Sequence, residues 1–178
     1  MKIELEVKIL DINIDEMKGK LESIGGTYKS SKVMRRYVYD FNPPRAWAWI
    51  RLRDNGKTVT ITIKEILNDE IDGTKELEVA VDSFDTTHQI LEKLWYTPKA
   101  YQENRRTSYA FDWVDIEIDE RPLIPPYLEI EWQSVEAIES VIAKLWYKMD
   151  DTTSNNTKKI YQQYGIELES IKNLSFDN

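Results

Sequence analysis

The chain of 178 residues has no cysteine and a single histidine, His88. The lack of cysteine excludes disulfides, thiolate metal sites and cysteine nucleophiles, and one histidine excludes a histidine-rich metal site. No apolar run approaches the ~18 residues of a membrane-spanning helix, and the N-terminus is charged at Lys2, Glu4 and Glu6, where a secretory signal would be apolar. We therefore expect a cytoplasmic protein in which His88 is a surface or helix-face residue and not a catalytic base.

Glycine is scarce and tryptophan is frequent, with six of each, whereas glycine usually makes up ~7% of a chain. A helix-like segment ends in Ile or Leu followed by a short turn at three places, and the residue after it is Gly25, Trp95 or Trp146. A left-handed residue suits such an end, and glycine adopts that conformation most easily. Either the tryptophans cover apolar faces and the helices end in another way, or reassigned codons place glycine there in the native protein. The same alternatives apply to Trp47, Trp49 and Trp132.

Acidic residues outnumber basic ones by 32 to 24, which gives a net charge of −8. A general surface for nucleic acid or for anionic membranes is therefore disfavoured, because it would need an excess of positive charge. A polyanionic ligand would need a local basic pocket. The length is typical of one compact domain.

Charged and apolar residues alternate along much of the chain, the pattern of strands with one apolar face. Turn signals such as Asp54-Asn55-Gly56 and Asp72-Gly73 predict hairpins, and hence antiparallel pairing. The predicted strands cover residues 1–9, 35–41, 49–53, 59–65, 75–81, 102–111, 113–119 and 127–132. Helical patterns cover residues 14–24, 85–94, 135–145 and 156–164, the first three preceded by the capping residues Asn13, Ser83 and Ser134. The pattern predicts an α+β fold with eight antiparallel strands.

The charged faces of these strands have two possible places. They can face solvent, or the sheet can close into a barrel whose outer, apolar face packs against helices and whose interior is charged. Enclosed charges must be paired or neutralised by a ligand. Carboxylate pairs two residues apart, Glu4/Glu6 and Glu129/Glu131, then suit Mg²⁺ or Mn²⁺.

The basic residues indicate the other half of such a ligand. Arg51 and Arg53 are two residues apart and carry forked donors that match phosphate oxygens, while Lys8 and Lys64 supply compact positive charge. Acidic groups for a metal and basic groups for phosphate together fit a metal-bound polyphosphate.

The segment Glu4-Leu5-Glu6-Val7-Lys8 resembles the ExExK signature of the CYTH superfamily, also called triphosphate tunnel metalloenzymes. An ordered series of similar short motifs follows: Ile50-Arg51-Leu52-Arg53, Thr62-Ile63-Lys64, Glu76-Leu77-Glu78, Arg106-Thr107-Ser108-Tyr109, Ile118-Asp119 and Leu128-Glu129-Ile130-Glu131. The resemblance covers about residues 1–165. It implies a single domain over residues 1–178: an eight-stranded antiparallel tunnel with a charged interior and helices outside, a C-terminal helix at about 156–165 and a short tail.

The resemblance also implies roles for individual residues. The carboxylates that would hold Mg²⁺ or Mn²⁺ are Glu4, Glu6, Asp119, Glu129 and Glu131, with help from Glu78. The residues that would bind substrate are Lys8, Arg51, Arg53, Lys64, Arg106 and Lys158, and those expected to serve catalysis are Glu6, Glu78 and Lys8. Three register alternatives stay open: Arg105 for Arg106, Glu76 for Glu78, and Lys159 for Lys158. Where many relatives have Gln and Asp in the second strand, this chain reads Met34-Arg35-Arg36, which places an extra arginine near the tunnel mouth.

The function implied is divalent-metal-dependent phosphoryl transfer on a triphosphate, with hydrolysis as our first hypothesis. The alternatives are a class IV-type adenylyl cyclase that converts ATP to cyclic AMP and pyrophosphate, and a binding module without turnover. The expected partner is a small molecule, namely tripolyphosphate, ATP or thiamine triphosphate, and neither nucleic acid nor a membrane. The protein is expected to be a monomer or a homodimer.

Overall fold

The computed structural model describes residues 2–68 and 70–177, with the backbone alone for residues 2–4. Eight strands form most of the molecule, and a ninth, of two residues, lies near the C-terminus. They are β1 (Lys2–Ile9), β2 (Thr27–Asp40), β3 (Ala48–Asp54), β4 (Val59–Ile66), β5 (Thr74–Val81), β6 (Pro98–Phe111), β7 (Val114–Arg121), β8 (Ile124–Trp132) and β9 (Asn173–Leu174).

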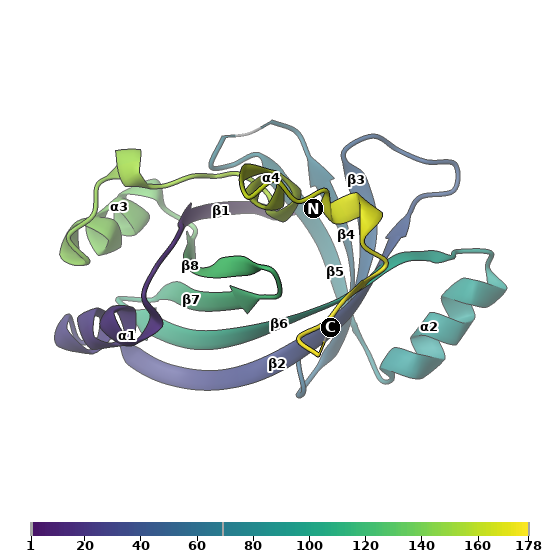
Figure 1. Ribbon diagram of the computed structural model, residues 1–178, viewed down its shortest axis with the longest axis horizontal. Coiled ribbons are helices and arrows are strands. Elements are labelled where there is room, and N and C mark those ends of the chain that lie inside the picture. The colour runs from purple at the N-terminus through teal and green to yellow at the C-terminus, as the bar shows by residue number, and fades with distance from the viewer. Residues whose placement is uncertain (1, 69, 178) are drawn as a thin grey trace.

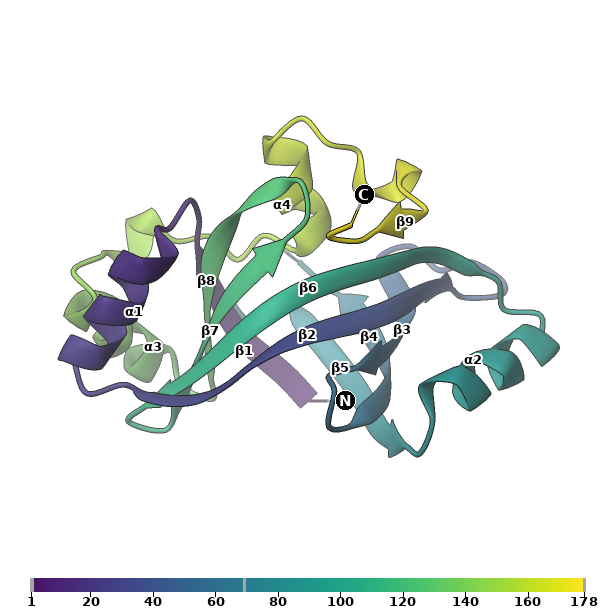
Figure 2. The same ribbon diagram turned by 60° about the horizontal axis from the view of Figure 1, so that its bottom comes forward.

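The eight long strands form one antiparallel sheet that closes on itself. Around the sheet β2 is followed by β3, β4, β5, β1, β8, β7 and β6, and β6 pairs again with β2. This last pairing runs from Thr27 opposite Ala110 to Tyr39 opposite Pro98, and the two long strands lie side by side in both ribbon views (Figure 1, Figure 2). The predicted fold class, an eight-stranded antiparallel barrel with helices outside, is confirmed.

Four helices lie outside the sheet: α1 (Ile14–Ser23), α2 (Phe84–Lys93), α3 (Val135–Lys144) and α4 (Thr157–Gln163). Short 3₁₀ turns cover Met149–Asp151 and Leu168–Ser170. The predicted caps are confirmed: Asn13 accepts hydrogen bonds from two backbone amides of the first turn of α1, and Ser83 and Ser134 each accept one in α2 and α3. Such bonds satisfy amide groups that a helix start leaves without partners.

The helices cover the apolar face of the sheet. In both ribbon views α1 and α3 lie together at one end of the molecule and α2 lies at the other (Figure 1, Figure 2). Leu21 of α1 and Ile142 of α3 pack in one buried cluster with Ile116 of β7 and Ile130 of β8. Because alternate side chains of a strand point to opposite faces, burial of these residues under helices turns their charged neighbours inward.

Two smaller clusters complete the outer packing. Phe84 and Leu91 of α2 pack with Leu52 of β3. Tyr161 of α4 packs with Tyr127 of β8 and donates a hydrogen bond to the carbonyl of Pro122 at 2.8 Å. Helix α4 is thereby fixed close to one opening of the barrel, where it contributes to the cavity described below.

Most strand bounds lie within about four residues of the predicted ones, with two exceptions. Strand β2 begins at Thr27, although the prediction began at residue 35, because residues 27–33 are mostly exposed and lack an apolar alternation. Their pairing with β6 keeps them extended. Strand β9 was not predicted, since two residues carry no periodicity; it pairs in parallel with Tyr101 and Gln102 of β6. Within the described residues, no helix is long and apolar enough to cross a bilayer.

Candidate functional site

A charged cavity of about 810 Å³ lies inside the barrel. Among the side chains that the structure describes, ten lysines and arginines line it against seven aspartates and glutamates, an excess of three positive charges, although the whole chain carries −8. The charged lining residues are Glu6, Lys8, Arg36, Asp40, Arg45, Arg51, Arg53, Lys64, Glu76, Glu78, Lys99, Arg106, Arg121, Glu129, Glu131, Lys158 and Glu169. The sequence-based choice between a solvated face and an enclosed one is therefore decided for the enclosed one.

Strands β3, β4 and β5 form a wall in which basic and acidic groups are interleaved. The Arg51 guanidinium lies 3.4 Å from Glu76 and 3.5 Å from Glu78, and that of Arg53 lies 3.5 Å from Glu78. Lys64 forms a close ion pair with Glu76. Burial, together with the nearby charges of Arg51 and Arg106, lowers the pKa of Arg53 to about 10. This wall therefore holds more positive charge than its own carboxylates neutralise.

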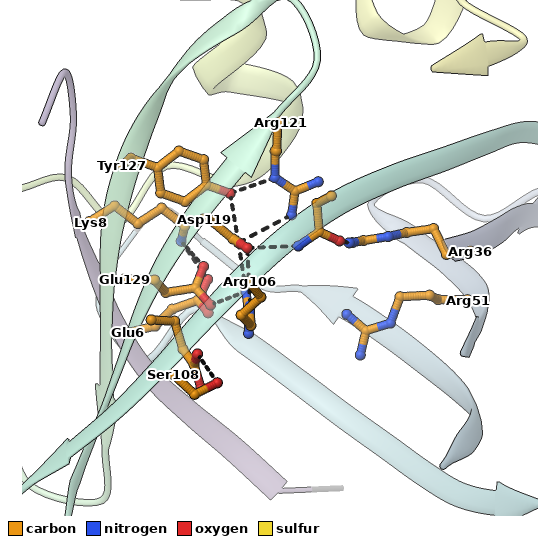
Figure 3. Close-up of polar contacts among 12 residues, drawn as sticks. Glu6, Lys8, Arg36, Arg51, Arg106, Ser108, Asp119, Arg121, Tyr127 and Glu129 are labelled. Carbon is orange, nitrogen blue, oxygen red and sulfur yellow. Dashed lines mark hydrogen bonds and ion pairs between the residues drawn. The ribbon is translucent and has the colours of Figure 1, made fainter. Parts of the chain in front are cut away.

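Strands β1 and β8 form a second wall, centred on Lys8 and shown in Figure 3. The Lys8 ammonium is almost fully buried and lies 2.7 Å from Glu6 and 3.7 Å from Glu129. Burial alone would lower the pKa of Lys8, but the attraction of these two carboxylates outweighs it and raises the pKa above its ordinary value. Cross-strand pairing sets Glu6 opposite Glu131, so three carboxylates with described side chains line this wall.

Asp119 lies beneath the cavity and does not line it. Its side chain is 0% exposed and accepts hydrogen bonds from Arg106 at 2.7 and 3.1 Å and from Asn104 at 2.7 Å (Figure 3). Burial would raise the pKa of Asp119, but Arg106 and Arg121 outweigh it and lower the pKa far below its ordinary value. Its carboxylate oxygens are thus already engaged by cations and by an amide, a place that differs from the metal-ligand role expected from the sequence.

Two buried arginines of the lining were not among the predicted site residues. Arg36 donates a close hydrogen bond to Asn104, and Arg121 donates one to the Tyr127 hydroxyl at 2.7 Å. Arg36 Nε and Arg121 Nη1 are buried and have no hydrogen-bond partner in the protein. Burial, and then the charges of Arg121 and Arg51, lower the pKa of Arg36 well below its ordinary value. Donors of this kind are available to an anion.

The period-two pattern contained the signal for Arg121. Residues 115, 117 and 119 alternate with the buried Val114, Ile116 and Ile118, and one more step reaches Arg121. The predicted strand ended at residue 119, two residues too early, and so left this arginine out. For Arg36 the sequence indicated only a place near the tunnel mouth.

For each register alternative, the structure shows whether one or both of the two residues line the cavity. Arg106 faces the cavity, whereas Arg105 is exposed and pairs with Glu120 at 3.2 Å. Glu76 and Glu78 both line the cavity. Lys158 of α4 also lines it.

Lys158 pairs with Glu169 at 2.5 Å, while Lys159 is not part of the lining. The backbone of Glu4 pairs with Thr74 of β5, but the Glu4 side chain lies outside the described residues. Glu117, to which the sequence gave no site role, accepts a hydrogen bond from Ser108 at 2.6 Å. Burial raises the pKa of Glu117 to about 7, although Arg106 and Ser108 act in the opposite direction.

The donor chemistry of the cavity suits a hard divalent cation. Glu6, Glu129 and Glu131 offer only oxygen, which Mg²⁺ and Mn²⁺ prefer. Among the side chains that the structure describes, no three acidic or histidine groups gather closely enough to form a complete metal cage. Mg²⁺ commonly takes one or two carboxylates together with phosphate oxygens of the substrate, so this arrangement fits an ion that binds with its substrate.

Solved structures share the fold at low sequence identity. A conserved hypothetical protein from Pyrococcus furiosus is 22% identical, with a TM-score of 0.73, over 86% of this chain and 97% of its own. A putative adenylate cyclase from Vibrio parahaemolyticus is 15% identical, with a TM-score of 0.74, over 90% of this chain and 98% of its own. A putative adenylyl cyclase from Hippeastrum, described as having a dominant triphosphatase activity, is 13% identical, with a TM-score of 0.65, over 93% of this chain and 96% of its own.

No curated protein matches this chain. The family model of the CYTH domain, by contrast, matches residues 2–163, which include all eight long strands and the four helices. Apart from Glu4, whose side chain lies outside the described residues, the charged residues of the motifs that suggested the resemblance line the cavity or, for Asp119, lie beneath it. The chain belongs to the CYTH domain family.

Proposed function

We propose that the cavity binds a triphosphate together with Mg²⁺ or Mn²⁺ and hydrolyses it. The observation that carries this proposal is the excess of three positive charges among the described side chains of the cavity wall, in a chain whose net charge is −8. Enclosed like charges repel one another, and a polyanion is the ligand that relieves this repulsion. A neutral or cationic ligand would leave it in place.

The arginines supply the main contacts to phosphate. Arg51 and Arg53 project from neighbouring inward positions of β3, and Arg36 projects from β2, which pairs with β3. Guanidinium groups match phosphate oxygens with two parallel hydrogen bonds. Arg53 Nε and Arg36 Nε are buried donors without protein partners, so phosphate oxygens would satisfy them. Lys64 and Arg106 add positive charge from β4 and β6.

The carboxylates of β1 and β8 would hold the metal. Glu6, Glu129 and Glu131 lie on one wall, and Lys8 between Glu6 and Glu129 fixes their carboxylates. When bound, the divalent ion neutralises charge on the phosphate oxygens and polarises the bond to phosphorus. Asp119 would contribute indirectly, because its ion pair with Arg106 positions the Arg106 guanidinium.

Hydrolysis also needs a group that orients the attacking water. Glu78 accepts a hydrogen bond from Thr62 at 2.6 Å. Burial would raise the pKa of Glu78, but this bond and the charge of Arg53 outweigh it and lower the pKa, so the carboxylate is ionised at neutral pH. It can accept a hydrogen bond from water as the water oxygen bonds to the terminal phosphorus. The bridging P–O bond breaks, and tripolyphosphate gives pyrophosphate and orthophosphate.

Product analysis tests the proposal. The protein would be incubated separately with tripolyphosphate, ATP and thiamine triphosphate, each with Mg²⁺, Mn²⁺ or a chelator. We expect metal-dependent release of orthophosphate. Cyclic AMP and pyrophosphate from ATP would instead show an adenylyl cyclase. A rise in melting temperature with each triphosphate, but no product, would show a binding module without turnover.

A pair of arginine variants connects this activity to the cavity. Arg53→Gln should weaken tripolyphosphate binding by about 10- to 100-fold, the range for one charged hydrogen-bonded contact. The matched control is Arg35→Gln, because Arg35 lies on the exposed side of the same region and pairs with Asp54 at 3.2 Å. Equal affinities for the two variants, measured by titration calorimetry, would contradict the proposed site.

A further inference from the structure

Four of the six tryptophans have a backbone conformation that suits glycine. The φ angles of Trp47, Trp95, Trp113 and Trp146 are 60°, 68°, 73° and 64°. Among all other non-glycine residues of the described chain, only two aspartates and one leucine have a positive φ. Only a few per cent of non-glycine residues adopt positive φ, and aspartate and asparagine are enriched among them. Such a concentration in tryptophan, a bulky residue, is therefore not a general property of this backbone.

The ends of the four helices form a direct internal comparison. Helix α1 ends with Gly25 at φ 89° and α4 ends with Gly165 at φ 73°, while α2 and α3 end with Trp95 and Trp146 at the corresponding position. Helices commonly end in a left-handed residue of this kind, and glycine is the usual choice because it has no Cβ.

The hydrogen bonds at these four ends follow one pattern. In α1 the next residue, Gly26, donates its amide to the carbonyl of Leu21 at 2.7 Å. In α2 the equivalent bond joins Tyr96 to Leu91 at 2.9 Å, and in α3 it joins Tyr147 to Ile142 at 3.1 Å. In α4 it joins Ile166 to Tyr161, also at 3.1 Å. The two tryptophans thus stand in the same motif as the two glycines.

The turn between β6 and β7 supplies an independent case. Phe111 pairs with Val114, so Asp112 and Trp113 form a two-residue hairpin loop, with φ angles of 47° and 73°. A loop with positive φ at both positions is a type I′ turn, for which Asp-Gly is among the preferred sequences. Here the glycine position holds Trp113.

The tryptophan side chains gain little that would offset this conformation. Trp95 and Trp113 are 86% and 83% exposed, and Trp47 and Trp146 are also exposed. Lys20 lies 5.7 Å from the ring of Trp146, a weak surface contact. Trp49 and Trp132 differ, because both lie within strands and are partly buried. The backbone gives no reason to expect glycine at those two positions.

We propose that the protein as made in its own cells carries glycine at positions 47, 95, 113 and 146, because codons read as tryptophan in this sequence are glycine codons there. Four replacements would raise the glycine content from six to ten residues and bring it closer to the usual ~7%. The inference does not depend on the proposed function. It does alter the site, because Trp47 lines the cavity, and glycine there would leave the cavity larger.

Peptide mass spectrometry of the protein isolated from the cells that naturally make it tests the proposal. Peptides that cover the four positions should have the masses calculated for glycine. Tryptophan masses at these positions would overturn the proposal, and so would glycine at only one or two of them.

Recombinant variants test the physical basis separately. Trp95→Gly, Trp113→Gly and Trp146→Gly should each raise the melting temperature by about 2–8 °C, since each removes the cost of about 1–2 kcal/mol of one left-handed L-residue. The matched control is Trp132→Gly, which should lower the melting temperature because glycine weakens a strand interior and Trp132 packs against the α1/α3 cluster. A lower melting temperature in all four variants would contradict the argument from conformation.

Discussion

Removal of the Arg106 guanidinium should destabilise the protein strongly, because it would leave a buried carboxylate without its main counter-charge. Arg106 lies 2.7 Å from Asp119, which is 0% exposed, and 2.8 Å from Glu129. Loss of one partner of a buried ion pair typically costs about 3–5 kcal/mol. In a chain of this length each kcal/mol of lost unfolding free energy lowers the melting temperature by about 2–4 °C, so Arg106→Met should lower the melting temperature by about 6–20 °C.

The neighbouring residue provides the control. Arg105→Met removes the same side chain from the exposed face of β6, where Arg105 pairs with Glu120 at 3.2 Å. An exposed pair is worth about 0–1 kcal/mol, so the melting temperature should fall by less than about 4 °C. Adding Asp119→Asn to Arg106→Met should recover part of the loss, because the uncompensated charge is removed. Scanning calorimetry measures all three variants, and equal losses for Arg105→Met and Arg106→Met would refute the reasoning.

Three further perturbations have expected outcomes. Because folding raises the pKa of Glu117 from 4.5 to about 7, the folded state holds this proton more tightly than the unfolded state, and the free energy of unfolding should fall by up to about 3 kcal/mol as pH rises from about 4.5 to 7. Glu117→Gln should remove this fall. Urea melts at pH 5 and 8 that show the same pH dependence for the variant as for the original protein would contradict the prediction. Leu52→Ala should lower the free energy of unfolding by about 2–5 kcal/mol because Leu52 is fully buried. Leu77→Ala, at an exposed position, should lower it much less, and urea melts of the two variants measure both changes. Glu4→Gln combined with Glu6→Gln should abolish metal-dependent turnover of tripolyphosphate while circular dichroism stays unchanged, and retained activity would contradict the metal role.

Alternation in the sequence predicted eight antiparallel strands with one charged face, and the family resemblance predicted that this face lies inside a barrel. In β3, Ile50 and Leu52 are buried against the outer core while Arg51 and Arg53 face the cavity, as a period of two requires. A slip by one residue would reverse both faces, so the pattern fixes the register strongly. Lys8, Arg51, Arg53, Lys64 and Arg106 were found from this pattern and from the family resemblance, whereas Arg36 and Arg121 were not.

The distinction between lining the cavity and lying beneath it could not be predicted in this way. Asp119 and Glu129 both occupy inward positions of their strands, yet only Glu129 lines the cavity. Depth depends on the neighbouring side chains, here Arg106 and Asn104 of the adjacent strand β6 and Arg121 of β7 itself, which surround the Asp119 carboxylate. Periodicity gives the direction of a side chain but not the size of the groups around it.

The pairing of β9 with β6 protects a stretch of open backbone. Strand β7 covers β6 only from Arg105 onward, so the earlier part of β6 has β2 on one side and β9 on the other, and the amide of Tyr101 donates to Lys172 at 2.9 Å. Unpaired strand edges recruit other chains. A molecule truncated before residue 172 should therefore expose amide and carbonyl groups that a second molecule can pair with, so the tail contributes to solubility as well as to shape.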